Sequence, residues 1–233
     1  MTAEPSGATG MRAGRSSPRF VLFDLDGTLV DPGPGIIGSA QHALKELGRD
    51  VPPAQDMQWI VGPPLRQSFA RLLGTGDMVE KAVELYRAAY GNGGITQASP
   101  YPGIFDALDR LRRKGHLLYL CTAKPLPFAR RVIDHFDFAA YFDALSGAEL
   151  DGRFDDKGAL VDHILASRGL RAEHGCMVGD RAIDTLAARQ NGMPSVGVTW
   201  GYGHRRELLE NGATVLCERV RDLPDQVEQL LRG

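Results

Sequence analysis

Short apolar runs alternate with helical repeats of apolar residues along most of the chain, and this alternation restricts the possible folds more than any other feature. Each apolar run is short enough for one buried strand, and residues at helical spacing follow most of them. A helix between two strands returns the chain across the sheet, so that consecutive strands lie parallel. The sequence therefore predicts an α/β fold in which helices cover both faces of a parallel sheet.

The expected elements can be placed by residue range. Strands are predicted at 20–23, 117–121, 144–147, 175–179, 195–199 and 214–217. Helices are predicted at 104–114, 128–136, 157–167, 182–190, 205–211 and 223–231.

One long segment interrupts the alternation. After the first strand, residues 31–35 (Asp-Pro-Gly-Pro-Gly) are expected to form a loop, and only helical patterns follow up to about residue 100. We therefore expect residues 34–100 to form an inserted helical domain that closes over the carboxyl ends of the strands. Residues 20–33 and 101–233 are then expected to form the sheet domain.

The run Phe20-Val21-Leu22-Phe23 ends in two carboxylates, Asp24 and Asp26, followed directly by Gly27. A buried strand delivers the side chains at its end to a crevice at the sheet edge, and glycine lets the chain turn sharply there. Two neighbouring carboxylates repel each other and need a positive partner to stay ionised. Because hard cations prefer oxygen ligands, Mg²⁺ is the expected partner.

The segment Asp24-Leu25-Asp26-Gly27-Thr28 resembles the first motif of the haloacid dehalogenase superfamily of phosphatases, which is an Asp-x-Asp-Gly-Thr run after a strand. The inserted helical segment is similar to the helical-cap branch of that superfamily. The resemblance implies a Rossmann-like parallel sheet core with an inserted α-helical cap domain. It extends from Phe20 to about Val220.

Three further segments match the remaining motifs of the superfamily in type and order. Thr122 ends the strand that follows the helical insertion, and its hydroxyl can donate to a phosphoryl oxygen. Lys157 begins a predicted helix, and Asp180 and Asp184 lie one helical turn apart after another strand. Both aspartates can approach one cation.

The resemblance also implies a mechanism. Asp24 is the expected nucleophile, which forms an aspartyl-phosphate, and Asp26 is the expected general acid and base. Thr122 and Lys157 are expected to hold the other phosphoryl oxygens. Mg²⁺ is expected to bind Asp24, the main-chain carbonyl of Asp26, and Asp180, with Asp184 supporting it directly or through water.

The substrate is expected to be a small phosphomonoester. Phosphoglycolate and nucleoside 5′-monophosphates are the two candidates, and the segments at 122–125 and 146–152 resemble the 5′-nucleotidase-like members. Arg66, in the helical insertion, is a candidate for reading a carboxylate or a second phosphate of the substrate. Lys124, near the strand end, is a second candidate contact.

Other interpretations of these residues are open at this point. Asp180 can cap the following helix, and Lys157 can be a surface lysine paired with Asp155 or Asp156. Arg66 and Lys124 can be solvated charges.

Other functions are open as well. A phosphosugar mutase of the same branch shares every core motif, whereas a true haloacid dehalogenase needs neither Mg²⁺ nor the second aspartate. A non-hydrolytic phospho-accepting domain has its acidic pair and its acceptor on different strands. No Gly-x-Gly-x-x-Gly follows a strand, and the histidines lack metal-ligand spacing, so dinucleotide binding and zinc hydrolysis lack support.

Composition and net charge limit the partners and the cellular location that can be expected for the chain. The formal net charge of −2 gives no electrostatic reason to expect nucleic acid or a membrane surface as partner. Cys121, Cys176 and Cys217 lie in or beside apolar runs and are expected to be buried thiols. Residues 1–19 are expected to form a disordered tail. No apolar stretch is long enough for a bilayer, so a cytoplasmic enzyme is the expectation. The oligomeric state is left open between a monomer and a homodimer.

Overall fold

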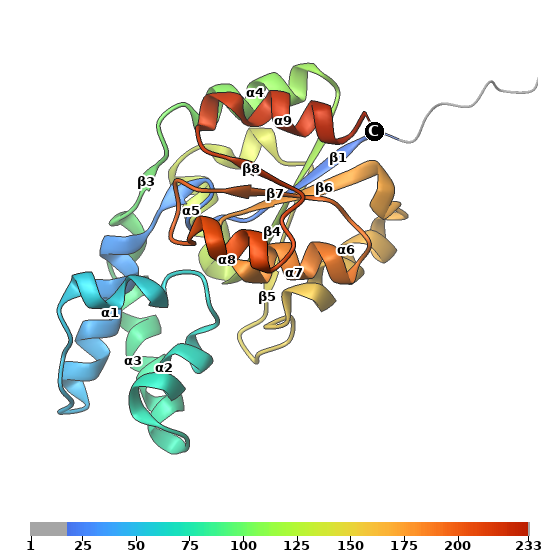
Figure 1. Ribbon diagram of the computed structural model, residues 1–233. Coiled ribbons are helices and arrows are strands. Elements are labelled where there is room, and N and C mark those ends of the chain that lie inside the picture. Colours follow the sequence, from blue (N-terminus) through green and yellow to red (C-terminus); the bar gives the residue numbers. More distant parts are fainter. Residues whose placement is uncertain (1–17, 233) are drawn as a thin grey trace, which may run out of the picture.

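The structure, a computed structural model, describes residues 18–232 (Figure 1). Apart from Pro18 and Arg19, the predicted tail lies outside the described residues. A six-stranded sheet forms the centre, in the order β5-β4-β1-β6-β7-β8, and every neighbouring pair is parallel. Its strands are β1 (Phe20–Phe23), β4 (Leu117–Pro125), β5 (Ala144–Ala148), β6 (Gly175–Gly179), β7 (Ser195–Val198) and β8 (Val215–Cys217). The predicted α/β class is confirmed.

Helices cover both faces of this sheet. Figure 1 shows α4 and α9 above the sheet and α6, α7 and α8 below it; α5 packs beside β4 and β5. The helices are α4 (Ile104–Arg113), α5 (Leu126–His135), α6 (Lys157–Arg168), α7 (Ala182–Gln190), α8 (Arg205–Glu210) and α9 (Leu223–Leu230).

The two faces of β1 belong to separate hydrophobic clusters. Val21 and Phe23 pack into the cluster that includes α4, α5 and α9, whereas Phe20 and Leu22 pack into the cluster of α6 and α7. All four side chains are fully buried. A strand covered on both faces has no solvent side, which explains why its sequence is a continuous apolar run rather than an alternation.

A helical segment lies between β2 (Val30–Asp31) and β3 (Ser99–Pro100), away from the main sheet at the lower left of Figure 1. β2 and β3 pair antiparallel with each other. We call this region the helical segment throughout. It contains α1 (Gly33–Glu46), α2 (Leu65–Leu73) and α3 (Asp77–Gly91), with short 3₁₀ turns at Ala54–Ile60 and Gly94–Thr96.

Most predicted boundaries agree with the structure to within two residues, but three expectations were wrong. The expected loop at 31–35 contains the start of α1, because Pro34 occupies the first helical turn, where its missing N–H has no partner to lose. β2 and β3 are too short to produce an apolar pattern, so they were missed. β4 continues four residues past 121, to Pro125.

The three cysteines are buried and free, as predicted. Burial raises the pKa of the Cys121 and Cys176 thiols to about 12. Between residues 18 and 232, no helix combines the length and the apolar character that crossing a bilayer requires.

The central strands should dominate the stability of the fold. Leu118 in β4 is fully buried, whereas Leu209 on α8 is 52% exposed. We expect Leu118→Ala to lower the free energy of unfolding by about 2–5 kcal/mol, because it leaves a cavity in the core. The same change at Leu209 should cost less than about 1 kcal/mol. Denaturant unfolding measures both, and equal losses would contradict the assigned packing of β4.

Candidate active site

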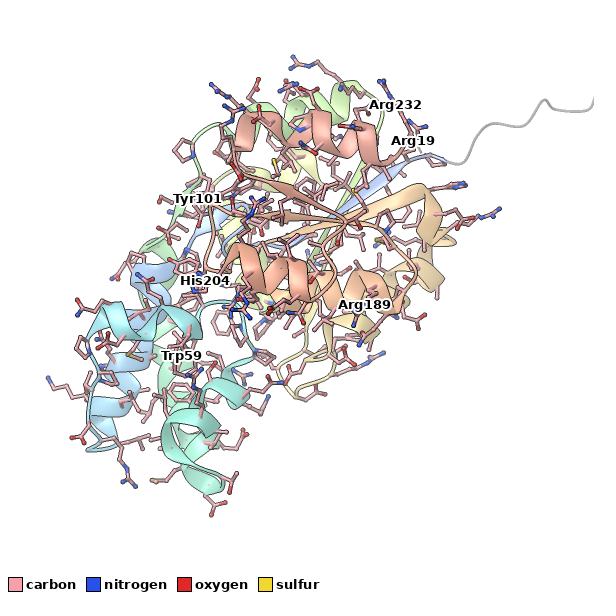
Figure 2. The ribbon with its side chains drawn as sticks, in the orientation of Figure 1. Arg19, Trp59, Tyr101, Arg189, His204 and Arg232 are labelled. Carbon is pink, nitrogen blue, oxygen red and sulfur yellow. The ribbon has the colours of Figure 1, made fainter. Side chains whose placement is uncertain are left out.

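The carboxyl ends of the central strands face the helical segment. Figure 2 shows Tyr101 and His204 at the end of the sheet next to that segment, whereas Arg19 and Arg232 lie at the opposite end. Arg19 immediately precedes β1, so the strand runs toward the helical segment. Side chains that follow β1, β4 and β6 therefore gather beside it.

The turn after β1 depends on glycine. The Asp24 N–H donates to the Val178 carbonyl of β6 at 2.9 Å, which extends the sheet pairing by one residue. Gly27 then adopts φ +82°, and a Cβ atom there would lie 2.2 Å from Oδ2 of Asp180. Only glycine combines this backbone conformation with so close an approach.

Asp24, Asp180 and Asp184 form a buried carboxylate cluster. One oxygen from each lies within 4.8 Å of the others. The Asp180 carboxylate accepts from the Tyr202 N–H at 2.7 Å and the Thr28 hydroxyl at 3.4 Å. Burial raises the pKa of Asp180 well above its usual range, and repulsion from Asp184 and Asp24 raises it further.

The helix-capping interpretation of Asp180 was wrong. The N-cap of α7 is Arg181, and Asp184 accepts the Arg181 N–H at 2.9 Å. Asp184 therefore both caps α7 and belongs to the carboxylate cluster.

Lys157 is the first residue of α6, and its side chain enters the carboxylate cluster. Its Nζ lies 3.0 Å from Oδ1 of Asp24 and also pairs with Asp184, and the residue is only 3% exposed. Burial by itself would lower the pKa of Lys157, but Asp184 and Asp24 outweigh it and the pKa is raised. The surface-lysine interpretation was therefore wrong, and the charge of Lys157 is held between two carboxylates.

Asp26 lies outside the carboxylate cluster, and its carboxylate pairs with the Lys124 ammonium. Both side chains are less than 10% exposed, so Lys124 is not a solvated charge. The second carboxylate oxygen, Oδ1, is buried and has no hydrogen-bond partner among the described residues. Burial raises the pKa of Asp26, while Lys124 opposes that effect.

The buried charges do not balance. Asp24, Asp26, Asp180 and Asp184 carry four formal negative charges, and Lys124 and Lys157 supply two positive ones. The nearby Arg181 guanidinium pairs with Glu207 at 3.0 Å. Two negative charges remain in a place where isolated charges are costly. The donor set and the charge therefore fit one hard divalent cation at the carboxylate cluster.

Thr122 lies on β4, at the same sheet edge as Asp24. Leu120 is paired with Phe23 across the β1–β4 ladder. The position on β4 opposite Asp24 is therefore residue 121, and Thr122 is the next residue along the strand. Its side chain is buried, and its oxygen accepts from the Lys124 N–H at 3.2 Å. Among residues 18–232 the hydroxyl has no acceptor of its own, so its proton can be donated to a ligand.

A pocket separates this edge from the helical segment. Asp26 and Lys124 line it from the sheet side, and Arg66 of α2 lines it from the helical segment. The remaining lining is mostly apolar and aromatic, and includes Ile36, Ile60, Leu65, Tyr86, Tyr90 and Phe128.

The Arg66 side chain is held by acidic neighbours. Its Nε donates to Glu80 at 2.8 Å, and Nη1 lies 3.9 Å from Asp155. Arg87 of α3 joins it, since both guanidiniums donate to the Leu150 carbonyl, at 3.4 and 3.2 Å. Arg87 also lines the pocket but was missed, because nothing in the sequence separates it from other helical arginines.

The chain matches the model of the family described as "Haloacid dehalogenase-like hydrolase" over residues 21–198. It is 41% identical to a 5′-nucleotidase of Pseudomonas aeruginosa over 89% of this chain and 95% of that protein. It is 37% identical to the tyrosine-protein kinase PtkA of Mycobacterium tuberculosis over 92% of this chain and 73% of that protein. It is 34% identical to phosphoglycolate phosphatase 1 of P. aeruginosa over 95% and 82%.

The fold is also similar to a crystal structure described as a predicted phosphatase from Clostridium acetobutylicum. The TM-score is 0.88 and the identity is 33%, over 92% of this chain and all of the other.

Divalent-cation binding at the carboxylate cluster can be tested without an activity assay. With Mg²⁺ at about 100 times its dissociation constant, the free energy of unfolding should rise by about 2.7 kcal/mol. Asp180→Asn should abolish this gain, and its metal-free form should be at least as stable as the metal-free parent, because a repelled buried charge is gone. Thermal unfolding measures both.

The Asp109→Asn variant, at a half-exposed position away from the cluster, is the matched control and should keep the full gain. An equal gain for Asp180→Asn would place the cation elsewhere.

Proposed function

Because the chain belongs to the haloacid dehalogenase-like hydrolase family, we propose that it is a Mg²⁺-dependent phosphatase that hydrolyses a small phosphomonoester through an aspartyl-phosphate. One observation carries the proposal. The Asp24 carboxylate lies at the end of a central strand, 3.0 Å from the Lys157 ammonium and inside a cluster with two further carboxylates. A carboxylate held in this way suits attack on phosphorus, because adjacent positive charge offsets the repulsion between two anions.

In the first step, an Asp24 oxygen bonds to phosphorus and the ester P–O bond breaks. Asp26 gives a proton to the leaving oxygen. In the second step, Asp26 takes a proton from water, and the water oxygen displaces Asp24 and releases phosphate. Oδ1 of Asp26 has no hydrogen-bond partner within residues 18–232, and Asp26 lines the pocket; both observations support this role.

Lys157 and Thr122 are proposed to hold phosphoryl oxygens. The Lys157 ammonium contacts the nucleophile itself, so it can reach a group bonded to Asp24. The Thr122 hydroxyl belongs to the neighbouring strand β4, one residue past the position opposite Asp24. Both groups are buried and preorganised, so little ordering is needed during the reaction.

Mg²⁺ is proposed to bind Asp24, Asp180 and the main-chain carbonyl of Asp26, with Asp184 supporting the site. A bound divalent cation would offset the charge of the carboxylates and of the phosphoryl oxygens. The two uncompensated negative charges of the site support this assignment.

Residues 34–100 are proposed to act as a cap domain on a sheet domain formed by residues 20–33 and 101–233. The pocket between them supports this division, because side chains of α2 and α3 face Asp26 and Lys124 across it. A cap of this kind excludes water and selects the leaving group.

The substrate class is proposed to be phosphoglycolate or a nucleoside 5′-monophosphate, with Arg66 and Lys124 contacting it. Relatives named for both activities support this pair of candidates. The aromatic lining, with Tyr86, Tyr90 and Phe128, favours the nucleoside, because aromatic faces stack on bases.

Transfer of the phosphoryl group to an acceptor other than water is the second candidate. The 37% identity to a protein named as a tyrosine-protein kinase favours it. Product analysis separates them, since a hydrolase releases inorganic phosphate, a transferase moves the phosphoryl group to another molecule, and a mutase yields a positional isomer of the sugar phosphate.

Replacing the proposed nucleophile should abolish phosphate release from a panel of 2-phosphoglycolate, nucleoside 5′-monophosphates and sugar phosphates. We expect Asp24→Asn to have no measurable activity, because an amide cannot form the aspartyl-phosphate. Asp26→Asn should lose about 10²–10⁴ in kcat. Asp109→Asn serves as the folded control. Activity that persists in Asp24→Asn would refute the covalent mechanism.

Removing the Arg66 guanidinium should weaken substrate binding. Arg66→Ala should raise KM about tenfold with little change in kcat, because an interaction present before and during the reaction is lost. Arg71, on the same helix, stacks on Trp59 and does not line the pocket. Arg71→Ala is therefore the matched control for steady-state kinetics, and equal KM values for both variants would remove Arg66 from the site.

A further inference from the structure

The loop at residues 199–204, between β7 and α8, crosses the turn that follows β1. The Trp200 indole N–H donates to the Thr28 carbonyl at 3.1 Å. The next contact is made by Tyr202, whose main-chain N–H donates to Asp180 at 2.7 Å. This loop therefore touches both the turn after β1 and the carboxylate cluster.

The hydroxyl of Tyr202 contacts a different part of the molecule. It donates to Oδ1 of Asp31, the last residue of β2, and the same oxygen accepts the Gly33 N–H at 3.0 Å. β2 leads into α1, and its partner β3 returns the chain from the helical segment. The hydroxyl is therefore bonded to one of the two strands that join the helical segment to the sheet.

The packing around Tyr202 leaves little room for independent movement. A Cβ atom on Gly201 would lie 2.3 Å from the Gly27 carbonyl oxygen, and one on Gly203 would lie 1.7 Å from the Asp180 carbonyl oxygen. A Cβ atom on Gly33 would lie 2.0 Å from the Tyr202 hydroxyl. The main chain on either side of Tyr202 therefore packs directly against the main chain of Gly27 and Asp180. Because such close packing leaves no free space, a displacement of one segment is transmitted to the other.

We propose that Tyr202 is a positioning residue that connects the carboxylate cluster to the hinge of the helical segment. Its main-chain N–H orients Asp180, and its hydroxyl fixes Asp31, where the chain leaves β2 and enters α1. Tyr202 thereby couples the position of the pocket-lining helices over the substrate to the position of the strand ends. The inference deepens the proposed phosphatase function and rests on it for its kinetic readout.

Tyr202→Phe tests the connection, because it keeps the ring and the main-chain N–H and removes only the hydroxyl. A hydrogen bond to a charged acceptor contributes enough to change an equilibrium about tenfold or more. We expect KM for the phosphomonoester to rise about tenfold. The Mg²⁺ concentration for half-maximal stabilisation should stay unchanged, because the N–H that holds Asp180 remains. A general loosening of the loop would weaken both.

A double-mutant cycle with Asp31→Ala identifies the partner. In the Asp31→Ala background, the hydroxyl has lost its acceptor, so Tyr202→Phe should have no further effect on KM. Tyr101→Phe is the matched control, because Tyr101 packs on Trp200 in the same corner and its hydroxyl makes no hydrogen bond within residues 18–232. Equal effects of Tyr202→Phe in both backgrounds would overturn the proposal.

Hydrogen exchange tests the hinge without relying on activity. Deuterium uptake by peptides covering residues 29–34 should be about tenfold faster in Tyr202→Phe than in the parent or in Tyr101→Phe. If the parent chain releases no phosphate from any ester, the proposed function fails while this measurement still decides the hinge contact. Unchanged uptake at 29–34 would overturn the inference even in an active phosphatase.

Discussion

The constraint on which the rest of the structure depends is the mutual repulsion of carboxylates buried at one sheet edge. Asp24, Asp180 and Asp184 bring oxygens within 4.8 Å of one another with almost no exposure to water. Such an arrangement is costly unless positive charge lies beside it. Lys157 supplies part of that charge from the first turn of α6, although a cation at a helix start is opposed by the helix dipole. Its unfavourable location becomes understandable because two carboxylates surround its ammonium group.

The parallel sheet brings together groups that are far apart in the chain. Asp24 and Asp180 follow β1 and β6, and Thr122 lies on β4. These three strands are neighbours in the sheet, so residues that are far apart in the chain lie on adjacent strands. Asp24 and Asp180 each contribute a side chain directly after a strand, at the sheet edge where ligands bind in parallel sheets. The close contacts at Gly27 and Gly201 then let main chain approach the carboxylates, where any larger residue would displace Asp180.

The helical segment adds a second set of contacts above this edge. Arginines and tyrosines of the helical segment line the same pocket as the Asp26–Lys124 pair. The carboxylate proposed to transfer protons, Asp26, therefore lies between the sheet and the helical segment. Lys124 also lies 4.9 Å from the centre of the Tyr90 ring, which links the sheet edge to α3. The proposed chemistry at the strand ends and the proposed selection by the helices would therefore use the same pocket. In our proposal, the Tyr202–Asp31 hydrogen bond fixes the position of the helical segment over that pocket.

The sequence by itself determined the α/β fold and the residues gathered at the sheet edge, because buried strands are continuous apolar runs and a motif of fixed spacing marks the ends of β1 and β6. It did not determine the side-chain pairing. Lys157 was expected at the site from its motif and Lys124 only as a candidate contact, but their burial against Asp24 and Asp26 follows from strand order and helix placement. Arg87 and Tyr202 carried no signal at all, since the Arg87 guanidinium and the Tyr202 hydroxyl each bond to a residue more than 60 positions away. Only the tertiary structure decided these contacts, because local sequence periodicity reports which face of an element is buried and not which distant side chain it meets.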